Sequence, residues 1–279
     1  MVVQHNLQAM NSNRMLNVTT QSQAKSTEKL SSGYKINRAA DDAAGLAISE
    51  KMRRQVRGLT QASANAQDGI SCVQTAEGAL NEVHDMLQRI NELAVKGENG
   101  TLTTKDREYI GSEVRQLLSE IDRVQSTTTF NEQNLLDGTF DKGLQVGAEA
   151  GQHISIKIDN MNINTLYDGG TAPSKFYTDD ISALESADFG TLNTETKAAL
   201  EKVSTQRSDL GAVQNRLEHT IKNLDNVVEN TTSAESAIRD TDMATEMVRY
   251  ANNNVLSQAG QAMLAQANQA NQGVLSLLG

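Results

Sequence analysis

Aromatic residues, proline and cysteine are scarce in this chain of 279 residues. Aromatic side chains make up 3% of it, tryptophan is absent, and there is one proline. Large aromatic side chains usually fill wide globular cores, so their scarcity favours narrow helix–helix seams lined by aliphatic side chains. With a single proline, little in the sequence prevents very long helices. We therefore expect a mainly α-helical protein.

The residues that usually carry enzymatic or metal chemistry form no recognisable constellation. One cysteine, Cys72, excludes a disulfide within the chain, and its place in a helical pattern indicates a small buried hydrophobe. The four histidines are scattered, without H-E-x-x-H spacing or a cysteine–histidine cluster. Nucleophile-elbow, phosphate-loop and dinucleotide motifs are absent too. We expect no enzyme activity, no metal and no cofactor.

The charge balance is acidic, with a formal net charge of -10. Nucleic acids and anionic membranes attract basic patches, so we expect neither as a partner. The first residues, MVVQHNLQAMNSNRML, lack the apolar core of a secretion signal, and no run is long enough to span a membrane. On these grounds we expect the chain to stay in the cytosol, unless an export pathway recognises a different signal.

Three long stretches carry helical spacing of apolar residues. The strongest predicts a helix over 44–96, and the sequence GENG ends it. The short connection to a second helix, 103–128, implies an antiparallel hairpin. A third seam predicts a helix over 194–235. The seam of the first consists of Ile48, Met52, Val56, Leu59, Ala66, Ile70, Val73, Leu80, Val83, Leu87, Ile90 and Ala94.

The centre of the chain has a different pattern. Glycine-punctuated runs over 130–160, with strict alternation from His153 to Ile158, predict short β-strands and hairpins. A short variable segment follows over 160–191. We therefore expect long antiparallel coiled-coil helices from both termini with a small β-hairpin region in the middle. The expected domains are an N-terminal helix and linker (1–43), a central rod (44–235) and a C-terminal helix (236–279).

The C-terminal stretch repeats small apolar residues at heptad spacing, among them Val255, Ala259 and Ala262, and the N-terminus offers a matching partner with Val3, Leu7 and Met10. A narrow two-helix coil of this kind buries little apolar area, which contributes only about 25 cal/mol per Å². Ordering the chain costs about 1–2 kcal/mol per residue. We therefore expect both termini to be disordered in a monomer and helical in an assembly, as in a subunit that polymerises through its ends.

Two charged clusters lie near the start of the expected rod. Asp41 and Asp42, set between alanines, can cap the rod helix and complement its positive end. The basic sequence MRRQVR, which contains Arg53 and Arg54, has no interleaved aromatic residues and follows Glu50. It favours a subunit contact or intrahelical ion pairs over the alternative, a nucleic-acid patch.

Both ends of the chain resemble bacterial flagellin, over about two-thirds of its length. The resembling segments are LSSGYKINRAADDAAGLAISEKMRRQVRGLTQASANAQDGIS, LQRINELAVKGENGTLT, EIDRVQSTTTFNEQNLLDG, RSDLGAVQNRLEHTIKNL and ANNNVLSQAGQAMLAQANQANQGVLSLLG. The centre, about 160–191, is short and is not recognisable. The chain therefore resembles a minimal flagellin with little or no outer domain.

The resemblance implies a structural subunit that self-polymerises into an extracellular flagellar filament for motility. It also implies unfolded passage through the type III export apparatus with an export chaperone, and contacts with filament cap and junction proteins. Flagellins pair their terminal helices as an inner tube and their central helices as the surrounding wall. Residues 30–44 would link the two, with Asp41 and Asp42 seating the rod against a neighbour.

The resemblance also implies recognition by host Toll-like receptor 5. The matching residues are Arg89, Leu93 and Glu113, and we expect Arg89 and Leu93 to be exposed beside the rod seam. The terminal leucines Leu275, Leu277 and Leu278 match the tail that lies in the filament core and that binds export chaperones and a cytosolic innate sensor.

Three other functions remain as alternatives to flagellin. A hook–filament junction protein shares the terminal helices but does not propagate into filaments. A flagellin with a metalloprotease insert would need H-E-x-x-H, which this chain lacks. A pure coiled-coil scaffold would not need the β-rich centre.

Overall fold

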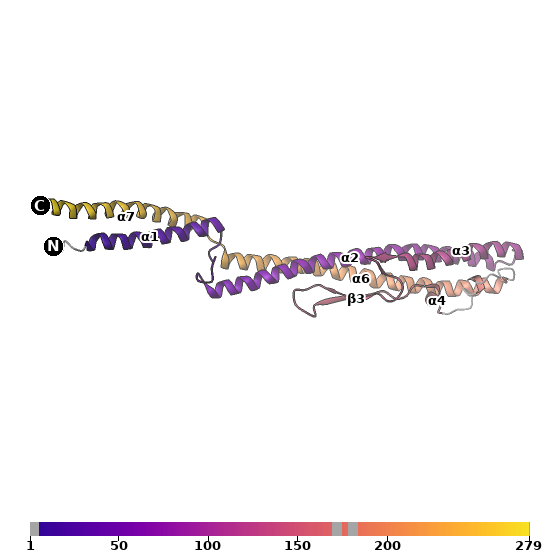
Figure 1. Ribbon diagram of the computed structural model, residues 1–279. Helices are drawn as coiled ribbons and strands as arrows, with labels where there is room; N and C mark the ends of the chain where they lie inside the picture. Colours follow the sequence, from indigo (N-terminus) through magenta and orange to yellow (C-terminus); the bar gives the residue numbers. More distant parts are fainter. Residues whose placement is uncertain (1–5, 169–174, 178–183, 279) are drawn as a thin grey trace. The chain divides into compact units, whose positions relative to one another are not determined.

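The structure is a computed structural model that describes residues 6–168, 175–177 and 184–278, with side chains up to residue 269 (Figure 1). Helices dominate, as the sequence predicted, and the strands are few and short. The elements are α1 (Leu7–Ser32), α2 (Ala43–Glu98), α3 (Thr104–Thr127), β1 (Thr129–Phe130), β2 (Gln133–Asn134), β3 (Asp141–Gln145), β4 (His153–Lys157), α4 (Ile163–Leu166), α6 (Ser186–Arg239) and α7 (Met243–Leu278).

The chain forms two compact units. One unit, the terminal unit, contains residues 1–56 and 229–279, and the other, the rod unit, contains residues 57–228. The divisions predicted from the sequence fall after residues 43 and 235. Assignment of these units to an inner tube and a wall stays a prediction.

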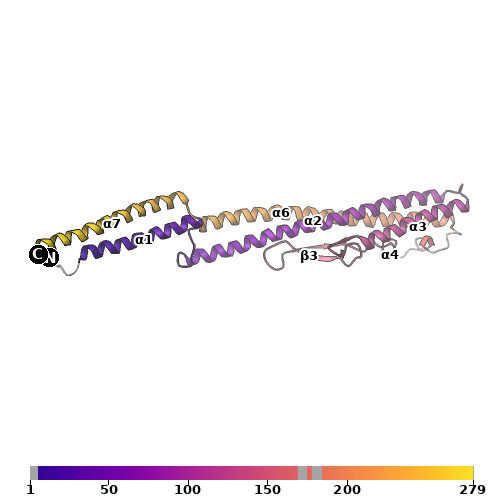
Figure 2. The ribbon, with the colours of Figure 1, turned by 45° about the horizontal axis from the view of Figure 1, so that its top comes forward.

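In the rod unit, α2 runs antiparallel to both α3 and α6 (Figure 2). Arg107 Nε donates to the Gly97 carbonyl at 3.2 Å, and Arg89 Nη2 lies 2.8 Å from Glu113 Oε1, so residue numbers fall along α2 as they rise along α3. The Ser186 hydroxyl bonds to the Glu98 carbonyl at 2.7 Å, and Arg207 lies 3.8 Å from Glu77. These pairs set α6 antiparallel to α2 as well.

Local sequence signals mark the helix ends. Thr103 and Asp106 form a capping box at the start of α3, in which the Thr103 hydroxyl accepts from the Asp106 N–H and the Asp106 carboxylate accepts from the Thr103 N–H. At the end of α1, Gly33 adopts a left-handed conformation with φ of 78° and donates its N–H to the Lys29 carbonyl. Glycine accommodates this φ without the steric cost that a Cβ would add.

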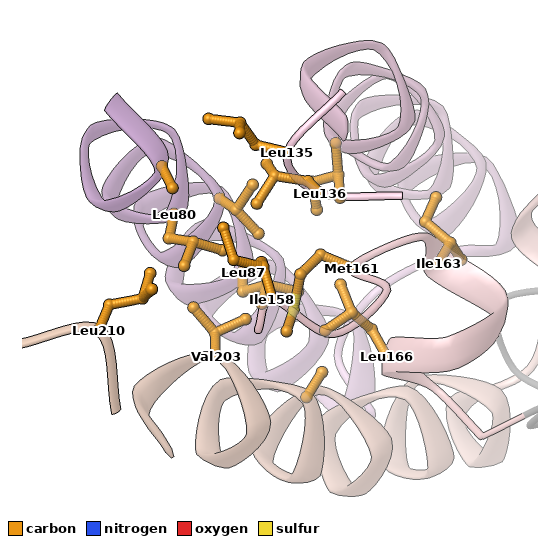
Figure 3. Packing of buried hydrophobic residues seen from close by; sticks show 14 of the residues in the cluster. Leu80, Leu87, Leu135, Leu136, Ile158, Met161, Ile163, Leu166, Val203 and Leu210 are labelled. Carbon is orange, nitrogen blue, oxygen red and sulfur yellow. The ribbon is translucent and has the colours of Figure 1, made fainter. Parts of the chain in front are cut away.

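An aliphatic core runs through the rod unit between α2, α3 and α6. Figure 3 shows Leu87 of α2, Val203 of α6, and Ile158 and Met161 of the central segment gathered in this core. Cys72 belongs to this core, since its side chain is 4% exposed, and burial raises the pKa of its thiol. The prediction that Cys72 is a buried hydrophobe is confirmed.

Two small antiparallel hairpins occupy the centre of the chain. β1 pairs with β2, and β3 pairs with β4. In β4, Ile154 and Ile156 are buried while His153, Ser155 and Lys157 are exposed, which confirms the alternation seen in the sequence. The Asn65 amide of α2 donates to the Gln145 carbonyl of β3 at 3.0 Å, which holds the β3–β4 hairpin against the helix.

The helix expected over 194–235 is longer than the sequence predicted, because α6 spans Ser186–Arg239. Its first turns carry Phe189, which is fully buried and meets the Phe176 ring edge-on, with ring centroids 5.2 Å apart. Phe189 also lies against Gly97 of α2. These contacts are tertiary, so the apolar spacing along the chain gave no sign of the earlier start.

The contact between Gly97 and Phe189 makes the rod unit sensitive to one methyl group. A Cβ at Gly97 would lie 2.3 Å from Phe189 Cδ1, whereas a Cβ at Gly78 of the same helix would meet nothing within 4 Å. We predict that Gly97→Ala lowers the free energy of unfolding by about 1–3 kcal/mol through overpacking. Gly78→Ala should raise it by about 0.5–1 kcal/mol through helix propensity. Urea unfolding of both variants measures the two effects, and equal effects would contradict the packing described.

Candidate assembly and recognition surfaces

The predicted assembly residues of α7 lie on a solvent-exposed apolar stripe. Val255 is 65% exposed, and Ala259 and Ala262 are exposed as well. The side of α7 that faces α1 carries a different heptad. That inner heptad, which is buried or half-buried throughout, consists of Glu246, Tyr250, Asn253, Ser257, Gly260, Leu264 and Ala267. At 3.6 residues per turn, the apolar stripe lies on the opposite side of α7 from the seam.

Helix α1 has the same two-sided character. It lies along α7, in contact at Leu16 and Gly260 and through a hydrogen bond of 3.0 Å from the Asn6 amide to the Ala267 carbonyl (Figures 1 and 2). Its inward positions are mostly small or polar, and Ser26 is the buried one. Four large apolar side chains of α1 are exposed: Leu7, Met10, Met15 and Val18. Both terminal helices therefore turn apolar side chains outward.

Asp41 organises the linker that precedes α2. Its Oδ2 accepts from the backbone N–H of Arg38 at 3.0 Å and of Asn37 at 3.2 Å. These two hydrogen bonds, with smaller contributions from Lys25 and Lys29, hold the pKa of the Asp41 carboxyl below its usual value. By accepting hydrogen bonds from both N–H groups, the Asp41 carboxylate holds the backbone of the linker in a turn.

Asp42 caps α2. Its Oδ1 accepts from the Gly45 N–H at 2.9 Å, and its carbonyl accepts the first helical bond from Leu46 at 3.0 Å. Gly45 is buried, and a Cβ there would lie 2.8 Å from Ile36 Cδ1, so the linker folds tightly over the first turn of the helix. The structure thus confirms the capping expected of Asp42.

The basic cluster is split between paired and unpaired side chains. Arg53 lies 3.9 Å from Glu50, while Arg54 is exposed and makes no ion pair within the part of the chain that the structure describes. Glu50 also accepts from Arg239 at 2.9 Å. The sequence did not predict the pairing of Arg239 with Glu50, because no local pattern relates residues 189 positions apart.

Arg89 and Glu113, two of the three predicted receptor residues, lie together on the α2–α3 hairpin. Arg89 Nε and Nη2 donate to Glu113 Oε1 at 3.0 and 2.8 Å, and Nη1 donates to Glu92 at 3.0 Å. These bonds, above all those to Glu113, raise the pKa of Arg89. The guanidinium is about half exposed and keeps two of its five N–H donors for another partner.

The expectation that Leu93 is exposed is wrong. Its side chain is 2% exposed and belongs to the core of the rod unit. Positions 90, 93 and 94 all face inward, so the seam of α2 is wider here than the strict heptad suggested. A partner approaching this face meets Arg89 and Glu113, while Leu93 is not accessible to it.

The other sequence-based site predictions are limited by what the structure describes. The helix α7 includes Leu275, Leu277 and Leu278, but the structure describes only the backbone of these three residues and not their side chains. Within the described residues, three or more histidine, cysteine, aspartate or glutamate side chains nowhere gather as a metal site would require. None of the helices that the structure describes is long and apolar enough to cross a membrane.

The described surfaces define a class of protein. They are helix faces and ion pairs suited to packing, so the chain is a structural protein that associates through long helices. The chain matches the bacterial flagellin N-terminal helical region over residues 3–141 and the bacterial flagellin C-terminal helical region over residues 193–278.

Curated relatives agree over the full length. The chain is 52% identical to a flagellin of Halalkalibacterium halodurans and 49% identical to a flagellin of Bacillus subtilis, with 100% of each chain covered in both comparisons. It is 48% identical to the flagellar filament 31.3 kDa core protein of Treponema maltophilum, again over 100% of both. The crystal structure of Bacillus cereus flagellin matches with a TM-score of 0.50 and 27% identity, over 58% of this chain and 88% of that one.

The chain belongs to the bacterial flagellin family. It is a structural subunit that polymerises with itself into the extracellular flagellar filament, and it is not an enzyme. The alternative of a hook–filament junction protein is not favoured.

The geometry at Asp41 predicts a pH-dependent linker. A carboxyl whose pKa is lowered in the folded state stabilises that state above its unfolded pKa, which is about 4. This stabilisation is lost as the pH falls through the lower folded value. We therefore expect the amide protons of Asn37 and Arg38 to be protected from exchange at neutral pH and to lose protection below about pH 4. Hydrogen exchange followed by NMR measures this step, and Asp41→Ala should abolish protection at every pH.

Proposed function

We propose that the exposed apolar faces of α1 and α7 form the subunit contacts at the inside of the filament. The observation that carries this proposal is the direction of the α7 stripe, since Val255, Ala259 and Ala262 point away from α1. Exposed apolar side chains arranged along one helix face mark a surface that another surface covers. Copies of the same chain are the partners that a homopolymer supplies.

The composition of the α1–α7 seam supports conditional folding of the two termini. The seam consists largely of small and polar side chains, with a few larger apolar ones such as Leu16 and Leu264, so the pair gains little from the hydrophobic effect by itself. A helix pair of this kind needs added burial to offset the entropy of ordering. We infer that α1 and α7 are disordered in the free monomer and become helical as the subunit joins the filament.

Disordered termini also suit export before assembly. We infer that the chain passes unfolded through the type III apparatus and that a chaperone holds the region of Leu275, Leu277 and Leu278 beforehand. The resemblance to flagellins supports these two partners, as it supports contact with cap and junction proteins at the filament ends. Asp41, Asp42, Arg53 and Arg54 are proposed to seat the start of α2 on a neighbouring subunit.

We further infer that Toll-like receptor 5 recognises the α2–α3 hairpin of the released subunit through Arg89 and Glu113. The arginine is pre-positioned by two carboxylates, so little side-chain entropy is lost when it binds. Leu93 is buried in the core of the rod unit, so we do not propose it as a direct contact.

The assembly proposal predicts that charge on the apolar stripe blocks polymerisation without unfolding the subunit. Val255→Lys should raise the critical concentration for seeded assembly at least roughly tenfold, because the lysine would be buried without a partner. Gln261→Lys adds the same charge at an exposed position away from the stripe and is the matched control. Electron microscopy and sedimentation measure filament yield. Normal filaments from Val255→Lys would place the subunit contact elsewhere.

The recognition proposal predicts that Arg89→Ala weakens binding of the monomer to the receptor ectodomain roughly tenfold, through a lost charge-assisted contact. Arg123→Ala is the control, since Arg123 is an exposed arginine of α3 that pairs with Glu120 in a similar way. Surface plasmon resonance measures both affinities. Equal affinities for the two variants would remove Arg89 from the contact.

A further inference from the structure

Arg239, the last residue of α6, makes contacts with two other segments of the terminal unit. Its Nη1 donates to Glu50 Oε1 of α2 at 2.9 Å. Its Cζ atom lies 4.8 Å from the centre of the Tyr34 ring, in the linker that follows α1. The side chain is only 13% exposed, although Glu50 is about half exposed. A single guanidinium therefore joins three elements.

The backbone around Arg239 is paired with the same linker. Tyr34 forms an antiparallel bridge with Asp240, and the Lys35 N–H donates to the Arg239 carbonyl at 2.7 Å. The Thr241 N–H donates to the Gly33 carbonyl at 3.0 Å. The linker from α1 and the linker into α7 are thus tied to each other just where those two helices end and begin.

The chemistry of this contact requires arginine. A guanidinium is planar, so it can hydrogen-bond a carboxylate at its edge while its face lies against an aromatic ring. A lysine ammonium could keep the charge but not both contacts in this arrangement. Arg239 Nε is buried without a hydrogen-bond acceptor among the described residues, and the Tyr34 ring offers that group partial compensation.

We propose that Arg239 is a positioning residue for filament assembly, which with Tyr34 and Glu50 forms a latch between the two linkers. This proposal rests on the filament function and adds a device that controls it. With the latch closed, the end of α1 and the start of α7 are held together. Closing a loop in advance removes part of the entropy cost of pairing the helices.

The latch matters because the α1–α7 seam is weak. Helix nucleation is unfavourable, and a seam rich in small and polar side chains buries too little apolar surface to offset much of its free energy. Holding the two helix ends at a high effective concentration lets them pair in register when a subunit is added. Opening the latch should therefore slow and weaken assembly while the aliphatic core of the rod unit stays intact.

The test uses full-length chain and seeded polymerisation, with four substitutions. Arg239→Gln and Tyr34→Leu should each raise the critical concentration roughly three- to fivefold. Tyr34→Phe keeps the ring and should match the unsubstituted chain, while Arg239→Lys should lie close to Arg239→Gln. Arg207→Gln is the control, because Arg207 is another α6 arginine paired with an α2 glutamate, Glu77, without a ring contact.

A double substitution separates a latch from general destabilisation. Arg239→Gln with Tyr34→Leu should be no worse than the more severe single variant, since either change opens the same latch. The thermal unfolding midpoint of the soluble chain should stay the same in every variant. Strictly additive effects, a Tyr34→Phe defect as large as that of Tyr34→Leu, or a lowered unfolding midpoint would each overturn the proposal.

Seeded polymerisation of the unsubstituted chain separates failure of the latch proposal from failure of the assembly function on which it rests. If the unsubstituted chain forms no filaments with intact seeds, the assembly function fails. If it forms filaments and Arg239→Gln does so at the same critical concentration, only the latch fails.

Discussion

The seam between α1 and α7 consists largely of small and polar side chains, with few larger apolar ones such as Leu16 and Leu264, and this constraint shapes the rest of the molecule. Ser26, Ser257 and Gly260 allow the two helices to approach closely, but they bury little apolar surface. The apolar side chains of the same helices, such as Val255 and Met10, consequently face outward. A pair of helices built in this way gains stability from whatever surface covers it, and we propose that in the filament this surface belongs to other subunits.

The rod unit, by contrast, buries its apolar side chains within the chain itself. Its aliphatic core is continuous through α2, α3, α6 and the central hairpins, so it can fold without a partner. The linkers between the terminal helices and the rod helices carry strong local signals, such as the Asp42 cap and the left-handed Gly33. Such signals set where each helix starts and stops, even where burial contributes little. One chain therefore combines a stable rod core with terminal helices whose folding, as we infer, depends on assembly.

Local patterns predicted local features well. Alternation in 153–158 gave strand β4, and the position of Asp42 before an apolar run gave the cap of α2. Heptad spacing identified the stripe through Val255, but the pairing with Leu7 and Met10 that it suggested is wrong, because all three side chains are exposed and α7 faces α1 with another heptad. The early start of α6 depends on Phe189 meeting Gly97, and the Arg239 contacts join distant segments. Spacing along one helix also missed the burial of Leu93, because α3 widens the seam of α2 there.

Arg89 shows why assembly and recognition are difficult to separate on such a surface. Its guanidinium joins α2 to α3 through Glu113, and exposed ion pairs of this kind contribute little to stability. Their larger effect is to hold a charged group in one geometry at low entropic cost. A rod that must present an ordered face to its neighbours thus presents the same ordered face to any other protein. The order of this face comes from contacts within one chain, so we propose that recognition of the released subunit needs no additional site.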